Sequence, residues 1–438
     1  MKPTQAPELL LPAGDPEKLR VALAFGADAV YAGVPKYSLR TREIGFRREN
    51  LREAVEYTHR LSKKIYLVMN IYAHNLKVDG FLKELDYVAA WQPDGLIMSD
   101  PGLIALALKR YPQISIHLST QANTTNWTTV RFWRDLGIRR IILSRELHLN
   151  EIAHMHQKVP DVELEAFVHG AICIAYSGRC LISNYLNHRD ANQGTCTNSC
   201  RWEYKLAWEK GSILEVENSQ SPYTYESNTR LPDGFTLSEP KRHNEKMPIF
   251  EDEFGTYLMN SRDLCAIELL PDLVKAGVMS FKVEGRTKSA WYAAMTARSY
   301  RRAIDDMTAG RSFNPEHLRD LMTLSSRTYT TGFYTRNPRQ YGENFEDGYS
   351  VGFLYQVTGI LKEYDDTSSM GIFEVKNRMK TGSILELVTP EETIPFTLKV
   401  MENLKGEKLE TAHGGAGNVR ILLPKNPGDY AFLRQKTE

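Results

Sequence analysis

The chain has 438 residues, which at roughly 150 residues per domain predicts two or three domains. Hydrophobic residues make up 42% of the chain and charged residues 25%, an average composition that excludes a disordered protein, a collagen-like fibre and a disulfide-bonded mini-protein. The formal net charge is +1, so binding of nucleic acid would require a local basic patch rather than an overall positive charge.

The start of the sequence and the cysteine count bear on where the protein works. The stretch MKPTQAPELLLPAGD contains no apolar run of signal-peptide length, and no later run approaches the roughly 18 residues of a membrane span. The five cysteines are an odd number, which argues against a disulfide framework. We therefore expect a soluble, cytoplasmic protein that does not bind membranes.

Short apolar runs alternate with amphipathic segments over residues 1–326. Each run is bounded by turn or polar residues, as is typical of a buried parallel strand. The predicted strands are Leu9–Leu11, Ala29–Ala32, Ile65–Ile71, Gly95–Met98, Ile114–Leu118, Arg140–Leu143, Glu163–Val168 and Met279–Val283. Their alternation with helices predicts an α/β fold, a (β/α)8 TIM-like barrel. A doubly wound open sheet is the alternative, because periodicity does not determine closure.

Helical patterns occupy the segments between and after these strands. Asp15 followed by Pro16 predicts the N-cap and first turn of the first helix. Further predicted helices are Asn50–Leu61, Asp79–Trp91, Gly102–Tyr111, Ser289–Met307 and Pro315–Leu324.

Three later segments lack the alternation of apolar runs and helical patterns. Residues 203–255 are polar and irregular, which predicts a surface insertion that is either a lid or a loop without a role. Residues 327–346 read as a linker. Residues 347–438 contain short apolar runs separated by Gly, Pro and Asn turns, which predicts a small all-β domain, a barrel or a sandwich.

Four cysteines gather in the segment 171–202, namely Cys173, Cys180, Cys196 and Cys200. Four thiolates suit either tetrahedral zinc or an iron–sulfur cluster. The gap from Cys173 to Cys180 is too long for a zinc knuckle, so the spacing favours a cluster, with zinc and unrelated buried thiols as alternatives. Cys265 is predicted at an apolar position of a helix and is the reserve ligand if one of the four is not used.

Polar residues follow most of the predicted strands. In a barrel the carboxyl ends of the strands meet at one mouth, where active sites form. Any one such residue is more often a structural hydrogen-bonding group, but a ring of them favours a site. The candidates are Asn70, Gln121, Glu146, His169, Lys282, Glu284 and Arg286.

Basic residues mixed with aromatic ones occur near three of these strand ends. They include Lys36, Arg40, Arg42, Arg47, Arg48 and Arg52 around Tyr37, and Arg201 beside Trp202. This mixture suits phosphate contact with base stacking on single-stranded RNA, or carboxylate binding by arginine, and solvated helix faces account for part of it. Motifs for phosphate loops, dinucleotide binding, zinc proteases and serine hydrolases are absent from the sequence.

The stretches ELLLPAG, DAVYAG, NQGTCTNSCRWEY and FKVEGRTKS resemble the peptidase U-32 family, also called collagenase-like peptidases. Longer stretches such as YSLRTREIGF and SGRCLISNYLNHRDANQGTC resemble its tRNA-hydroxylating members, over nearly the whole chain. The resemblance implies prephenate-dependent hydroxylation of the wobble uridine of tRNA to 5-hydroxyuridine, the first step toward 5-carboxymethoxyuridine. It also implies a [4Fe–4S] cluster on Cys173, Cys180, Cys196 and Cys200.

On this basis the expected partners are the tRNA anticodon loop, prephenate and an unidentified electron donor. Residues expected at the substrate are Arg179, Arg201, Lys282, Glu284 and Arg286, with His169 and Glu146 as proton carriers and Gln121 or Asn70 on the base edge. Three alternatives stay open: a peptidase, for which the chain shows no catalytic constellation, a hydroxylase of ribosomal RNA or a quinone precursor, and a scaffold in which the metal is only structural.

Overall fold

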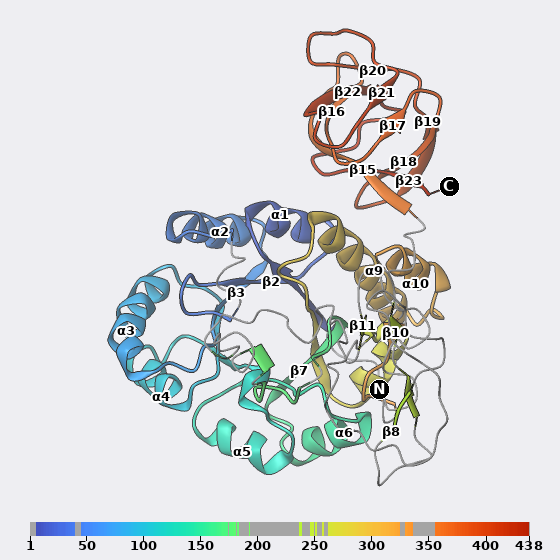
Figure 1. Ribbon diagram of the computed structural model, residues 1–438. Coiled ribbons are helices and arrows are strands. Elements are labelled where there is room, and N and C mark those ends of the chain that lie inside the picture. The colour runs from blue at the N-terminus through green and yellow to red at the C-terminus, as the bar shows by residue number, and fades with distance from the viewer. Residues whose placement is uncertain are drawn as a thin grey trace, which may run out of the picture.

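The structure is a computed structural model. It describes residues 6–39, 45–173, 175–180, 182–183, 192, 262–324, 329–335 and 355–437, and the backbone of four short strands between residues 236 and 257. These residues form a barrel and a smaller β-domain (Figure 1).

Eight parallel strands form a closed barrel. They are β1 (Glu8–Ala13), β2 (Ala29–Gly33), β3 (Lys64–Met69), β4 (Gly95–Met98), β5 (Ile116–Leu118), β6 (Arg140–Ile142), β7 (Glu163–Gly170) and β13 (Val278–Val283). Strand β13 pairs with both β1 and β7, which closes the ring and excludes the open sheet. The predicted TIM-like barrel is confirmed.

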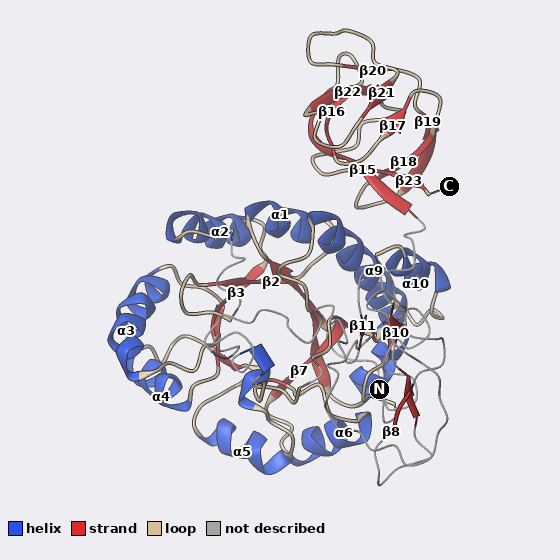
Figure 2. Cartoon of the chain, in the orientation of Figure 1, coloured by secondary structure: helices blue, strands red, loops and turns tan. Residues whose placement is uncertain are grey.

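Helices surround the barrel on the outside (Figure 2). They are α1 (Pro16–Ala24), α2 (Arg48–Arg60), α3 (Asn75–Ala90), α4 (Pro101–Arg110), α5 (Trp127–Asp135), α6 (Leu149–Lys158), α8 (Leu270–Lys275), α9 (Ala290–Thr308) and α10 (Pro315–Met322). The side chain of Asp15 caps α1 by accepting from the Lys18 amide at 2.8 Å, as predicted. No described helix has the length and apolar character needed to cross a bilayer.

Two short strands extend the barrel sheet beyond β7. Strand β12 (Asp263–Cys265) runs antiparallel to the end of β7, and β14 (Tyr329–Thr330) runs parallel to β12. The prediction of a helical position for Cys265 is therefore wrong. The free edge of β7 at His169–Gly170 pairs with this segment, and that partner is distant in the sequence. Strand β14 lies in the segment predicted as linker.

Short antiparallel strand pairs lie in the insertion and directly after it. Strands β8 (Thr236–Ser238) and β9 (Lys246–Pro248) pair antiparallel, as do β10 (Phe250–Glu251) and β11 (Thr256–Tyr257). The segment is therefore not irregular throughout. The remainder of 203–255 lies outside the described residues.

The β-domain is a curved antiparallel sheet that forms a half-barrel. Its order is β19 (Thr393–Thr397), β18 (Ile384–Val388), β23 (Phe432–Lys436), β15 (Tyr355–Asp365), β16 (Met370–Val375), β22 (Asn418–Leu422) and β20 (Met401–Glu402). A separate pair joins β17 (Met379–Lys380) to β21 (Thr411–Ala412). Phe373, Leu385, Ile421 and Leu433 are buried in a core of its own. The prediction of a small, barrel-like all-β domain is confirmed.

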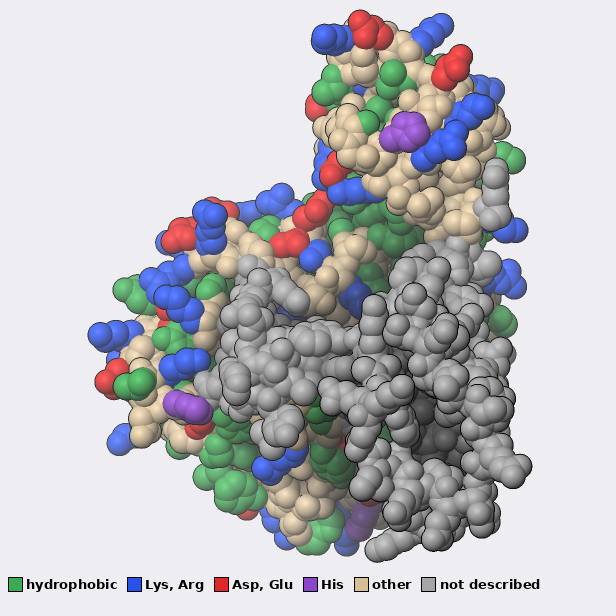
Figure 3. Space-filling model, in the orientation of Figure 1, with side chains coloured by type: hydrophobic (Ala, Val, Ile, Leu, Met, Phe, Trp, Pro, Cys, Tyr) green, Lys and Arg blue, Asp and Glu red, His purple; other side chains and the backbone are tan. Residues whose placement is uncertain are grey.

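The β-domain projects as a second lobe from the α9–α10 side of the barrel (Figure 3). The ring of Phe432 packs edge-on against Trp291 on α9, with centroids 5.3 Å apart. The buried Arg298 guanidinium donates to the Thr389 carbonyl at 2.9 Å and pairs with Asp320 at 3.1 Å. Apolar and charged contacts therefore fix the two lobes together.

Candidate functional site at the barrel mouth

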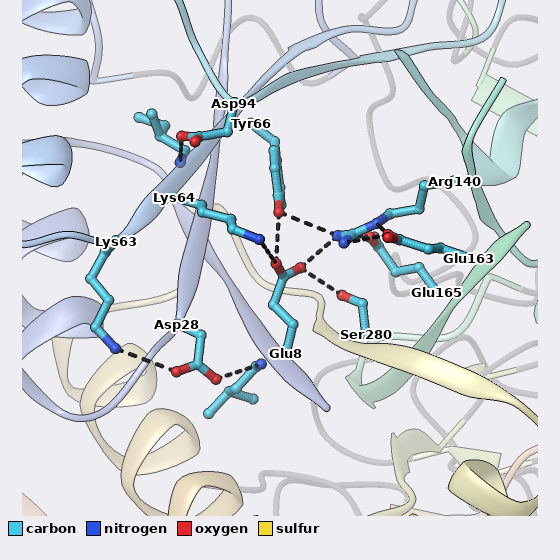
Figure 4. A network of polar contacts seen from close by, with 12 residues as sticks. Glu8, Asp28, Lys63, Lys64, Tyr66, Asp94, Arg140, Glu163, Glu165 and Ser280 are labelled. Atoms are coloured by element: carbon cyan, nitrogen blue, oxygen red, sulfur yellow. Dashed lines mark hydrogen bonds and ion pairs between the residues drawn. The ribbon is translucent and has the colours of Figure 1, made fainter. Parts of the chain in front are cut away.

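A network of charged and polar side chains joins several strands of the barrel (Figure 4). Glu8 accepts from Arg140 at 2.5 Å, from Tyr66 at 2.6 Å and from Ser280 at 3.0 Å. Burial works to raise the pKa of Glu8, but the Arg140 charge and the Tyr66 hydrogen bond bring it below its ordinary value. We call Glu8, Tyr66, Arg140, Glu165, Ser280 and Lys282 the interior network.

Lys282 belongs to this network rather than to the mouth. Its side chain is buried, and its ammonium donates to the fully buried Glu165 at 2.7 Å and lies 4.1 Å from the ring centre of Tyr31. Burial lowers the pKa of Lys282, and Glu165 opposes that shift. The sequence predicts that Lys282 binds the substrate, but its ammonium is already paired with Glu165.

Asn70 and Arg286 tie the loops of the mouth together. Asn70 accepts from the Leu39 amide at 3.0 Å, and its amide group donates to the Ser119 hydroxyl at 3.3 Å. Arg286 is buried and donates to the Leu39 carbonyl at 2.6 Å. Both side chains hold the loop after β2 in place, so the structure shows them positioning the mouth rather than facing an open site.

His169, at the end of β7, is enclosed by aromatic rings. Its Nδ1 lies 3.4 Å from the Tyr300 hydroxyl and its Nε2 lies 3.4 Å from the Tyr329 hydroxyl, and Tyr292 packs nearby. Burial, with help from the charge of Lys288, lowers the pKa of His169 to about 3. A proton carrier works best with a pKa near the ambient pH, so the buried, neutral His169 does not fit the predicted role.

Glu284 forms an ion pair with a residue of the loop after β6. The guanidinium of Arg145, after β6, lies 3.6 Å from the Glu284 carboxylate and 3.9 Å from the ring centre of Phe167. It also donates to the carbonyl of Ala171, the first residue of the cysteine segment 171–202. Arg145 therefore fixes where that segment leaves the barrel.

A tight turn at residues 176–179 connects Cys173 to Cys180. Its Ser177 donates to Glu146 from both the backbone amide, at 2.8 Å, and the hydroxyl, at 2.9 Å. Gly178, at φ +74°, presses against the Gln121 carbonyl, where a Cβ atom would come within 2.1 Å of the oxygen. Glu146 and the backbone of Gln121 therefore hold this turn in place. No local sequence pattern predicts these contacts, because the residues lie far apart in the chain.

The cysteines differ in exposure. Cys173 is exposed, Cys180 is partly exposed, and neither forms a disulfide. Cys265 is buried with its sulfur 3.8 Å from the Tyr300 oxygen, and burial raises its pKa to about 11, which makes it a poor thiolate donor. Cys196, Cys200 and Arg201 lie outside the described residues.

The described residues alone contain no cluster of three metal-ligating side chains. Cys173 and Cys180 are half of the predicted ligand set, and Cys173 is exposed and Cys180 partly exposed at the mouth. The donors that the structure does place therefore fit a thiolate-bound centre, whereas Cys265 does not.

A pocket of about 440 Å³ opens at the carboxyl ends of β3, β4 and β5, against the turn at residues 176–179. We call it the mouth pocket. The lining includes Tyr72, His74, Ser99, Ala122, Trp133, Gly178 and Arg179. The Tyr72 hydroxyl donates to the Gln121 carbonyl at 2.7 Å. Burial raises the pKa of Tyr72, and the nearby charge of Arg179 opposes part of that rise.

The protein is therefore a two-domain (β/α)8-barrel protein, with a cysteine-bearing turn at the mouth of the barrel and a separate β-domain. Residues 14–344 match the model of peptidase family U32, and residues 354–434 match the model of the family's C-terminal domain. The chain belongs to peptidase family U32, and the resemblance seen in its sequence is confirmed.

Curated relatives extend along the whole chain. The tRNA hydroxylation protein P of Escherichia coli is 47% identical, over 98% of this chain and 96% of that protein. The protein of the same name from Haemophilus influenzae is 46% identical, over 98% and 95%. A 23S rRNA 5-hydroxycytidine synthase of Escherichia coli is 30% identical over 98% of this chain and 58% of its own length.

Proposed function

We propose that the protein is a tRNA hydroxylase that converts the wobble uridine to 5-hydroxyuridine with the help of prephenate and a [4Fe–4S] cluster. The observation that carries the proposal is the 47% identity, along nearly the whole of both chains, with a protein named for tRNA hydroxylation. The relative named for 5-hydroxycytidine supports the same class of reaction, since it too is named for a hydroxylated pyrimidine of RNA.

The thiols of Cys173 and Cys180 would supply two ligands, and Cys196 and Cys200 the other two. A bound cluster would supply a redox or Lewis-acid centre beside the mouth pocket. The chain's own contribution is to hold the turn before Cys180 in one position, through the hydrogen bonds of Ser177 to Glu146 and the contact of Gly178 with Gln121.

The cationic side chains that the structure describes differ in whether a substrate can reach them. Lys282 and Arg286 are buried and hydrogen-bonded to the protein, whereas Arg179 is exposed at the mouth pocket. Within the described part of the chain, no carboxylate forms an ion pair with Arg179. Arg179 is therefore the described residue best placed to meet an anionic group. An anticodon loop already splays its bases, so presenting one at the mouth costs little.

Nucleoside analysis of RNA by mass spectrometry tests the proposal. We expect tRNA from a strain without this protein to lack 5-hydroxyuridine and its derivatives, and the wild-type chain to restore them. The Cys180→Ser variant should fail to do so. Unchanged tRNA with a missing nucleoside in ribosomal RNA would point to the other RNA substrate, and cleavage of gelatin without any change in RNA would favour a peptidase.

A further inference from the structure

We propose that the mouth pocket binds a single unstacked nucleotide of the RNA substrate, with the base inside and its phosphate at Arg179. The inference rests on the proposed function and deepens it, because it assigns a place and a set of residues to the nucleotide that reacts.

The walls of the pocket suit a planar base. Tyr72 is partly exposed and is held in place because its hydroxyl donates to the Gln121 carbonyl at 2.7 Å, so it is the ring available for stacking. Trp133 of α5, by contrast, is buried and contributes an apolar part of the lining. Both line the pocket. Aromatic rings that are already fixed stack on bases at little cost in conformational entropy, and stacking accepts any base because each has a π-face.

The distribution of charge distinguishes a nucleotide from a small organic dianion. The buried Ser99 and the partly buried Ala122 line the interior without charge, whereas Arg179 and His74 are exposed at the rim. A nucleotide places its neutral base inside and leaves its phosphate outside. Prephenate would bring two carboxylates into a space whose described lining offers no buried cation, a costly burial of charge. The lining therefore favours the nucleotide.

Size and position agree with this assignment. A volume of about 440 Å³ lies in the range of roughly 300–1,000 Å³ found for sites of small molecules. Gly178 and Arg179 form one wall, and Arg179 directly precedes Cys180 in the chain. A base in the mouth pocket would therefore lie against the turn that leads into the predicted cluster ligand.

Photo-crosslinking of the full-length protein tests the site without any substitution. A synthetic anticodon stem–loop carries 5-iodouridine at the wobble position and is irradiated in complex with the protein, and the linked peptide is mapped by mass spectrometry. We expect the link at Tyr72, the partly exposed aromatic residue of the lining. A link to a residue outside the mouth pocket, or a link at the pocket that prephenate displaces competitively, would overturn the proposal.

Two variants test the same site through binding of the unlabelled stem–loop. Ala122→Phe fills the pocket, and we expect about tenfold weaker binding, as for one lost base–aromatic stack. Arg179→Gln should weaken binding about fivefold and reduce the slope of log K against log salt by about 0.7, the value for one phosphate contact on a single strand. Pro101, the first residue of α4, also lines the pocket, and Lys109 lies at the other end of this helix, so Lys109→Gln is the matched control and should bind as the wild type does.

The outcomes separate the two proposals. Wild-type affinity in both pocket variants would contradict the nucleotide site. If the wild-type protein forms hydroxylated uridine while the crosslink lies elsewhere, only the pocket assignment fails. If no hydroxylated uridine forms under any condition, the proposed function fails, whatever the crosslink shows.

Discussion

The interior of the barrel and its mouth use positive charge in opposite ways. In the barrel interior, Arg140 and Lys282 are buried against Glu8 and Glu165, with the guanidinium and the ammonium each hydrogen-bonded inside the protein. At the mouth, Arg179 is exposed on a turn and faces a pocket. The sequence predicts the same role, substrate binding, for Lys282 and Arg179. Their positions in the barrel differ, and the position decides whether a cation stabilises the fold or is available to a ligand.

Breaking the interior network should have the largest effect. Glu165→Ala leaves Lys282 without its carboxylate and Arg140 with one fewer, and we expect the free energy of unfolding to fall by about 3–5 kcal/mol because buried charge is left uncompensated. Denaturant or thermal unfolding measures this loss.

The matched control is Glu163→Ala. Glu163 pairs with the same Arg140 at 2.7 Å, but its side chain is 54% exposed, so the loss should stay below about 1 kcal/mol. Equal losses in the two variants would show that the interior network is no more important to stability than a surface ion pair.

The buried His169 predicts a dependence on pH at the mouth. Its pKa is about 3 in the folded protein, below its ordinary value of 6.5, so the unfolded chain binds the proton between these two values. Stability should therefore be complete above pH 6.5 and fall as the pH drops toward 3, by at most about 1.4 kcal/mol per pH unit from this residue.

The difference between wild type and His169→Asn isolates this contribution. We expect the acid-side slope of the unfolding free energy to become shallower in the variant, while other titrating groups contribute equally to both proteins. Parallel pH profiles would contradict the buried, neutral state of His169.

A smaller and local effect should follow from weakening the turn before Cys180. In Glu146→Gln the bonds from Ser177 lose their charged acceptor, and we expect the turn to open more easily by about 1–2 kcal/mol. Hydrogen exchange measures this as faster exchange of the Ser177 amide, with little change in global unfolding.

Glu151→Gln is the control for this prediction. Glu151 also accepts from a backbone amide, that of His148 at the start of α6, but it makes no contact with the turn. Faster exchange at Ser177 in this variant as well would show that Glu146 has no special hold on the turn.

Local patterns predicted the fold because they depend on neighbours in the chain. Each barrel strand is an apolar run between polar residues, and the cap at Asp15 depends on a residue three positions away. The carboxylate partner of Lys282, by contrast, is 117 positions distant, and the three rings around His169 come from two later segments, α9 and β14. No window of sequence contains both members of such a pair.

The same reason explains the outcome at the cysteines. The clustering of four cysteines between residues 173 and 200 predicts a site at the mouth. The local pattern around Cys265 predicts a helix instead of a strand, because its strand partner, the edge of β7, is distant in the sequence. The Glu146 contact with Ser177 and the Gly178 contact with Gln121 likewise join separate loops that only the closed barrel brings together.

The central claim is that the mouth of the barrel carries the chemistry, whereas the interior network stabilises the fold. The most direct test of this claim is the iron and sulfide content of protein purified without oxygen. We predict about four irons and four sulfides per chain in the wild type and in Cys265→Ser, and a loss of both in Cys180→Ser. About one zinc and no iron in the wild type, or full iron and sulfide in Cys180→Ser, would contradict the account of the mouth as an iron–sulfur site.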